Sequence, residues 1–373
     1  MENVKNKKSR LAFPDMAKAA GIALVVVSHD LYAPEKLRSY ACTVSVAVFF
    51  VIAGMLVFLS GKKDRPFTAI LKDRALRLIV PYICFSVIDI LMLMYMNKKT
   101  GAELISGIDT AVIRTVSLNG VSVLWFLSAI FFSEFLWLLL LKCGDRCFKN
   151  ETAGAVFSFA AAGFLWGLAE VLYGFFTAEE KSMTALMVMQ TIFRIFPAAV
   201  LMGYGHIFYL LYERTGLKDA LAGKKRSIAD MLTALILLGV SFVASSKNVT
   251  ADLRTFFFGN IFLYVVTALA GSFGLLLFFK AFESLKEKLI FKIISFYGRE
   301  SLIIMLTHTD LLVLYYAEVI SFILMNRISF IGPLLQTFII IGGVFVLELP
   351  LIFVIERFFP FLAGGGSRHG RKA

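Results

Sequence analysis

Four ionisable side chains lie in one apolar segment near the N-terminus, FPDMAKAAGIALVVVSHD, which contains Asp15, Lys18, His29 and Asp30. A neutral imidazole can take a proton from a hydroxyl near pH 7, so His29 is a candidate general base for acylation of a hydroxyl. On an α-helix, Lys18 and His29 would point within about 20° of each other and lie about 16 Å apart along the axis. Asp15 precedes Lys18 by three residues, a spacing that allows an ion pair. The simpler interpretation of His29 is a hydrogen-bonded polar residue near a membrane interface, and this is also the interpretation expected for Asp30.

A second cationic group occurs in LKDRALRLIVP, where Arg74 and Arg77 are three residues apart. This spacing would direct both guanidinium groups to one side of a helix. A guanidinium fork suits phosphate oxygens, so the pair is a candidate phosphate-binding site. Pro81 follows and predicts a bend. The alternative is ordinary anchoring of a membrane helix by positive charge on its cytoplasmic side.

Further charged residues lie within apolar segments, where a charge is costly and is a functional hypothesis by default. Glu134 occurs in LWFLSAIFFSEFLW and needs a partner. The same segment begins with Trp125 and Phe126, an aromatic pair typical of a membrane interface. We expect Glu170 and Arg194 to pair with each other as a structural ion pair between neighbouring helices.

Near the C-terminus, GRESLIIMLTHTD adds Ser301, His308 and Asp310 to the candidates for polar side chains inside the membrane. His206 lies in an apolar segment beside Gly203 and Gly205 and is expected to have a structural role. Each of these residues has a bland interpretation as a hydrogen-bonded group in a helix bundle.

The elements that would position these groups are membrane helices. The chain has 373 residues, of which 59% are hydrophobic and 17% charged, and its mean hydropathy is +0.80. Soluble domains carry about 25% charged residues. Windows of about 20 apolar residues predict an all-α, polytopic membrane bundle of ten spans: 11–33, 40–60, 76–97, 122–142, 153–176, 186–212, 228–245, 254–282, 300–325 and 329–357.

The distribution of Lys and Arg indicates the orientation of these spans, because cytoplasmic loops are enriched in both residues. If both termini are cytoplasmic, the inside segments hold 27 of the 38 Lys and Arg residues and the outside loops hold nine. The other two, Lys18 and Arg194, lie within spans. The net charge of +12 therefore reflects membrane topology and does not indicate a nucleic-acid partner.

We expect one transmembrane domain over 1–361 and a disordered, basic, glycine-rich tail over 362–373. The segment 280–299 has apolar residues at helical spacing among lysines and predicts an amphipathic helix at the inner membrane surface. Cys143 and Cys147 are the only closely spaced cysteines of the four. Without further ligands nearby they predict free thiols and no metal site.

Five motifs occur in a set order along the chain. They are Lys18 with His29; FFVIAGMLV (Phe49 to Val57); Arg74, Arg77 and Pro81; Trp125 with Phe126; and Gly298, Ser301, Leu302 and His308. In this combination, over nearly its whole length, the chain resembles the membrane acyltransferase 3 family, whose members acylate surface polysaccharides, lipopolysaccharide and small molecules. Two departures leave the acceptor open: Ala53 stands where the family has serine, and SVAV replaces a His-Met-Pro motif before the double Phe.

The resemblance implies a role for most of the candidates. An acyl-CoA, expected to be acetyl-CoA, would bind its phosphates to Arg74 and Arg77 on the cytoplasmic side. His29 would be the base toward a hydroxyl of a carbohydrate or small-molecule acceptor, or would briefly carry the acyl group. Lys18 would steady the donor or the thioester oxygen, and Asp15 would hold Lys18.

Supporting roles are expected for Trp125, Glu134, Ser301 and His308. The enzyme would need no metal and no bound cofactor, and it would lie in the plasma or inner membrane.

A transporter or flippase for a polysaccharide precursor or small polar solute is the main alternative, because intramembrane charges also line substrate paths in carriers. A carrier should tolerate loss of His29 better than loss of Glu134, Glu170 or Arg194. A ligand-binding membrane sensor has no sequence feature in its favour.

Overall fold

The computed structural model describes residues 11–364 except for positions 62, 64, 102, 104, 179–181, 215–223 and 328–331. Its described part is all-helical, as the sequence predicts. The one β-type pairing among the described residues is an isolated bridge between Asp252 and Phe257. The predicted tail over 362–373 lies outside the described residues from position 365 onward.

The helices follow the chain as α1 (Phe13–His29), α2 (Glu35–Leu59), α3 (Phe67–Arg74), a π-helical turn (Ala75–Ile79), α4 (Val80–Thr100), α5 (Ile108–Val116), α6 (Trp125–Cys147), α7 (Glu151–Thr177), α8 (Met183–Phe193), α9 (Ile195–Arg214), α11 (Lys224–Ser246), α12 (Ile261–Ala281), a 3-10 turn (Glu283–Leu285), α13 (Leu289–Arg299), α14 (Ser301–Thr307), α15 (Val313–Arg327) and α16 (Pro333–Phe358).

Eight helical stretches in the described part are long and apolar enough to cross a membrane: Glu35–Leu59, Phe67–Thr100, Trp125–Cys147, Glu151–Thr177, Met183–Tyr212, Ser227–Ser246, Ile261–Ala281 and Pro333–Phe358. The first expected span, 11–33, is a helix of only 17 residues that ends at His29. The amide of Asp30 closes it by donating to the Val26 carbonyl at 2.9 Å.

The prediction of a ninth continuous span over 300–325 is wrong. This segment forms two helices, α14 and α15, joined by a turn over 308–312. Leu312 has a positive φ of 60°, which no helix accommodates. In the same turn the Thr309 hydroxyl donates to the Asp310 carboxylate at 2.9 Å. Short polar side chains that bond locally in this way compete with helical hydrogen bonds. Hydropathy registers the apolar content of the segment but not this break.

The expected span 254–282 is also shorter than predicted, because α12 begins at Ile261. The Asn260 side chain accepts from the Leu263 amide at 3.1 Å and caps the helix at its N-terminus. Residues 247–260 therefore form a loop. The expected amphipathic helix over 280–299 is shorter than predicted. It corresponds to α13, which begins at Leu289 and exposes Leu289 and Ile290.

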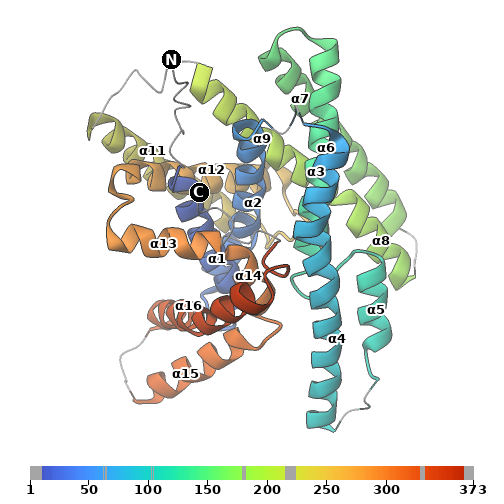
Figure 1. The fold of residues 1–373 in the computed structure, drawn as a ribbon, viewed down its shortest axis with the longest axis vertical. Coiled ribbons are helices and arrows are strands. Elements are labelled where there is room, and N and C mark those ends of the chain that lie inside the picture. Colours follow the sequence, from blue (N-terminus) through green and yellow to red (C-terminus); the bar gives the residue numbers. More distant parts are fainter. Residues whose placement is uncertain are drawn as a thin grey trace, which may run out of the picture.

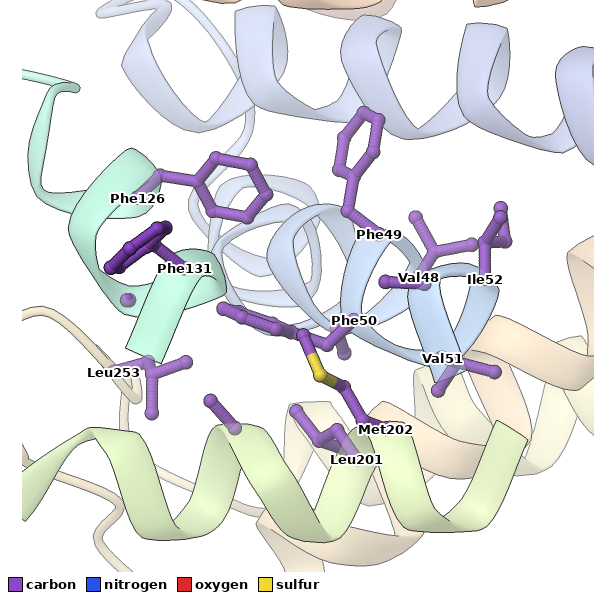
Figure 2. Packing of buried hydrophobic residues seen from close by; sticks show 14 of the residues in the cluster. Val48, Phe49, Phe50, Val51, Ile52, Phe126, Phe131, Leu201, Met202 and Leu253 are labelled. Atoms are coloured by element: carbon purple, nitrogen blue, oxygen red, sulfur yellow. The ribbon is translucent and has the colours of Figure 1, made fainter. Parts of the chain in front are cut away.

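The centre of the molecule is α2, which packs against α1, α9 and α12 (Figure 1). Figure 2 shows Phe49 and Phe50 of α2 beside Phe126 of α6, with Met202 of α9 next to them. The Phe50 and Phe126 ring centroids are 5.3 Å apart. A Cβ on Gly54 would collide with the Met202 carbonyl. The double-Phe motif thus lies where α2 contacts α6 and α9, and its glycine permits the close approach of α2 and α9.

Figure 1 shows α3 and α4 as one long, continuous rod at the side of this core, with α5 beside α4. On the opposite side, α13 packs against α1. There a Cβ on Gly298 would collide with the Asp15 carbonyl. The glycine of the C-terminal motif therefore allows close contact with the helix that carries Lys18 and His29.

Candidate active site

A cavity of about 250 Å³ lies where the C-terminal end of α1 meets α2, α6, α14 and the loop 247–260. Its wall includes Ser28, His29, Ser45, Ser122, Trp125 and Arg254. Two of these, His29 and Trp125, are among the predicted site residues. Apolar side chains supply more of the wall, so a ligand here would meet a few polar groups on an apolar background.

The His29 ring is held in one tautomer by its own helix. Its Nδ1 lies 3.1 Å from the Val25 carbonyl oxygen and 3.1 Å from the Ser28 hydroxyl. The Ser28 hydroxyl itself donates to the Val25 carbonyl at 2.7 Å. Because a carbonyl oxygen can only accept, Nδ1 carries the hydrogen and Nε2 keeps the lone pair. His29 is thus arranged as a base through Nε2.

His308 packs edge-to-face against His29, with ring centroids 5.3 Å apart. It occupies the turn between α14 and α15 and is fully buried. Its Nδ1 lies 2.9 Å from the Ile304 carbonyl and 3.0 Å from the Met305 carbonyl, which again leaves the lone pair on Nε2. That Nε2 has no hydrogen-bond partner among the described residues. The structure therefore brings together two predicted histidines that are far apart in sequence.

Lys18 and Asp15 form the expected pair, with Nζ 3.4 Å from the carboxylate. They lie toward the opposite end of α1 from His29 and do not line the cavity. Ser301 begins α14 and is also absent from the cavity wall. His206 packs its ring edge-to-face against Phe58 and Trp137 in the core, away from the cavity.

Arg74 and Arg77 diverge, contrary to the prediction that both point one way. Arg74 donates from Nη2 to Glu134 at 2.7 Å and from Nε to the same carboxylate at 3.0 Å. Arg77 instead pairs with Asp73, and both of these side chains are half-exposed. The π-helical turn Ala75–Ile79 takes up Arg77 and changes the helical register after Arg74. Glu134, which needed a partner, is buried against Arg74.

The expected ion pair of Glu170 with Arg194 is wrong. The Glu170 carboxylate accepts from Trp166 Nε1 at 3.0 Å. Arg194, fully buried, donates from Nη2 to the Leu118 carbonyl at 2.8 Å and to the Asn119 carbonyl at 3.3 Å. Main-chain carbonyls at a turn accept hydrogen bonds from the guanidinium in place of a carboxylate. Sequence patterns do not show which carbonyls are left over at a turn.

Through these bonds Arg194 stabilises the part of the cavity wall that contains Ser122 and Trp125. Its guanidinium lies over the Trp125 ring, 5.5 Å from the centroid, and Nη2 reaches the Ser128 hydroxyl at 3.2 Å. The turn it holds contains Leu118 and Ser122, both at positive φ. Non-glycine residues keep this conformation only where their surroundings enforce it. Arg194 thereby fixes the positions of Ser122 and Trp125.

A chain of polar contacts runs from the cavity wall into the bundle. The Ser122 hydroxyl lies 3.1 Å from the Thr309 hydroxyl, which donates to Asp310. Asp89 of α4 is buried and interacts electrostatically with Asp310. Asp89 is not among the residues predicted from the sequence, although a lone carboxylate in the apolar run FSVIDILML was a usable signal.

Another buried carboxylate, Glu348 of α16, lies beside the histidine turn. Both of its oxygens accept from the Thr307 hydroxyl, at 2.9 and 2.7 Å. Thr307 directly precedes His308, so this contact fixes the end of α14. Within the described ranges, no group of three His, Cys, Asp or Glu side chains is placed to hold a metal ion.

A family model described as an acyltransferase domain matches residues 11–353. This range includes every residue of the cavity wall. No curated protein and no solved structure matches the chain.

Proposed function

The chain belongs to the acyltransferase 3 family, and on this basis we propose that it is a membrane enzyme that moves an acetyl group from cytoplasmic acetyl-CoA to a hydroxyl of a carbohydrate or similar small acceptor. The helices long and apolar enough to span a membrane support a multi-pass membrane acyltransferase.

One observation carries the proposal: His29 lies on the wall of a cavity with its Nδ1 3.1 Å from the Val25 carbonyl, which leaves Nε2 to act as the base. In the proposed reaction the acceptor hydroxyl attacks the thioester carbonyl while Nε2 of His29 takes the hydroxyl proton. The new C–O bond replaces the C–S bond, and the thiolate of CoA leaves with the proton from His29. The Val25 carbonyl accepts from Nδ1 throughout and keeps the ring oriented. His308, against the ring of His29, is a positioning residue.

Arg74 and Arg77 have different roles in the proposed binding of the CoA phosphates. Arg77 is half-exposed and is the main partner for a CoA phosphate. Arg74 uses Nε and Nη2 to hold Glu134, which leaves Nη1 for a phosphate oxygen. Lys18 and Asp15 lie toward the other end of α1 from His29, and in this proposal the pantetheine arm passes them to bring the thioester to His29.

The carrier alternative is weakened by the contacts of its key residues. It depends on Glu134, Glu170 and Arg194 lining a path for solute. Glu134 is paired with Arg74, Glu170 accepts from an indole, and Arg194 is used by a turn. None of the three lies on the wall of the cavity that contains His29.

The test is release of free thiol from acetyl-CoA by membranes that contain wild type or His29→Ala, with a crude cell-envelope fraction as acceptor. His206→Gln is the matched control, because it removes a buried histidine away from the cavity. We expect turnover by wild type and the control and none by His29→Ala. Turnover that does not depend on His29 would refute the proposed mechanism.

A further inference from the structure

The loop between α11 and α12 presents an arginine to the cavity from a rigid turn. Residues Asp252 and Phe257 exchange two main-chain hydrogen bonds, of 2.7 and 3.0 Å, which close the turn. Leu253 and Phe256 are buried and belong to the main hydrophobic cluster. Figure 2 draws Leu253 in this cluster, below Phe131 of α6 in the view. A turn anchored in this way fixes the main chain of the residue at its tip, Arg254.

The carboxylate of Asp252, two residues before Arg254, is already used within the turn. Asp252 Oδ1 accepts from the Arg254 main-chain amide at 2.8 Å, and Oδ2 accepts from the Thr255 hydroxyl at 3.1 Å. Both bonds stabilise the turn and neither involves the Arg254 guanidinium. Asp252 thus contributes negative charge nearby without pairing with the arginine.

The Arg254 side chain lines the cavity together with His29 and is half-buried. Its guanidinium makes no ion pair and no hydrogen bond with any residue that the structure describes. Burial, and then the positive charge of Arg114, lower the pKa of Arg254, whereas Asp252 and Asp310 raise it. A partly desolvated cation with five N–H donors and no partner is a site for an anion.

We propose that Arg254 binds a carboxylate or phosphate of the acyl acceptor, so that the acceptor is an acidic sugar whose hydroxyl lies beside His29. Ser122 and Thr250 on the same wall supply hydroxyl partners for a sugar, and the Trp125 ring supplies an apolar face. Carboxylate and phosphate both match the planar fork of the guanidinium. That this anion is the acceptor depends on the proposed acyl transfer, whereas the anion site itself does not.

The anion site can be tested without turnover, by the rate at which diethyl pyrocarbonate modifies His29. Mass spectrometry of the peptide that contains His29 would follow this rate. The probes are methyl glucuronide, glucose 6-phosphate, neutral methyl glucoside and inorganic phosphate. The variants are Arg254→Gln, Arg254→Lys and, as a control of equal charge change, Lys247→Gln at an exposed position in the same loop.

We expect at least one of the two sugar acids to slow modification of His29 in wild type and in Lys247→Gln, and methyl glucoside to slow it far less. Arg254→Gln should weaken binding of that sugar acid about 10- to 100-fold, the range for a lost charged hydrogen bond. Arg254→Lys should retain part of the preference. Which sugar acid protects better distinguishes a carboxylate from a phosphate acceptor.

Three results would overturn the proposal. One is equal protection of wild type by methyl glucoside and by both sugar acids, a comparison that needs no variant. Another is a preference for acids that survives in a folded Arg254→Gln protein. The third is protection by inorganic phosphate as strong as that by the sugar acid that protects better, which would mean an adventitious ion only. If protection behaves as expected but no acetyl-CoA is consumed, the acyl-transfer proposal fails and the anion site stands.

Discussion

In the contact between α3 and α6, the Arg74 guanidinium lies 2.7 Å from the Glu134 carboxylate and is held by it through two nitrogens. On the cavity wall, by contrast, the guanidinium of Arg254 meets no carboxylate at ion-pair distance in the described part of the chain. The first arrangement neutralises a charge inside the bundle and joins two helices. The second leaves a cation and the base His29 open to the same space.

Whether a charged side chain has a partner inside the protein therefore distinguishes a structural role from a functional one. Its position in the sequence does not make this distinction. A buried ion pair loses much when one partner is removed, because the other charge remains uncompensated. When a residue lines a cavity and its side chain makes no ion pair or hydrogen bond, its replacement should lower the stability of the protein only slightly. Variants of Arg74 or Glu134 should therefore affect folding, and variants of Arg254 or His29 on the cavity wall should affect activity.

The largest effect on stability is expected from Glu134→Ala. It leaves Arg74 without its carboxylate and should destabilise the protein by about 3–5 kcal/mol. Thermal unfolding in detergent would show this as a large drop in midpoint and in yield. The double variant Arg74→Met with Glu134→Leu should recover most of the loss. If Glu134→Ala melts like wild type, the pair does not hold α3 to α6.

Arg194→Met should have the next largest effect on stability. It removes the donor to the Asn119 carbonyl, whereas the Leu118 carbonyl keeps a hydrogen bond from the Ser128 hydroxyl. A buried acceptor left without a donor costs about 2 kcal/mol. Because the same turn carries Ser122 and Trp125, acyl transfer should also fall in the protein that remains folded. The ratio of initial rate to folded protein, measured by size-exclusion chromatography, separates the two losses. A normal rate per folded molecule would show that the turn does not position the cavity wall.

His308→Phe tests whether the second histidine acts by position. Phenylalanine keeps an aromatic ring beside His29 but removes the bonds from Nδ1 to the Ile304 and Met305 carbonyls. We expect kcat to fall about tenfold, equivalent to about 1.4 kcal/mol, with little change in KM for acetyl-CoA. A fall as large as that of His29→Ala would make His308 a catalytic residue instead.

Arg77→Gln should have the smallest effect on stability and should selectively weaken the binding of acetyl-CoA. Its pair with Asp73 is half-exposed, and such pairs contribute less than about 1 kcal/mol. KM for acetyl-CoA should rise about tenfold with kcat unchanged, as for a residue that binds the ground state and the transition state equally. Acetyl-pantetheine, which lacks the adenosine phosphates, should react equally well with wild type and variant. Equal KM values for acetyl-CoA would place the phosphates elsewhere.

Much of the helix content could be predicted from hydropathy. The apolar runs of α2, α6, α7 and α16 exceed 20 residues and fold as expected. The break in the ninth expected span could not be predicted in this way, because it depends on the hydrogen bond of Thr309 with Asp310 and on a positive φ at Leu312. Hydropathy averages over these residues.

The candidate site was predictable to the extent that it depends on local spacing. The pairing of Asp15 with Lys18 follows from their separation of three residues. Partners on different helices were not predictable: Glu134 was assigned no partner, and Arg194 was given the wrong one. Arg254 and Ser122 were missed because their importance comes from a loop and a turn that meet at one cavity.

The most direct test of the account is the balance of acyl groups in purified protein with acetyl-CoA and an acidic sugar acceptor. Thiol release and ester formation would be measured together in wild type, His29→Ala and His206→Gln at equal amounts of folded protein. We expect one ester per thiol in wild type and in His206→Gln, and a loss of about 10³-fold or more in both products for His29→Ala. Ester formation by His29→Ala at the wild-type rate, from protein that is equally folded, would contradict it.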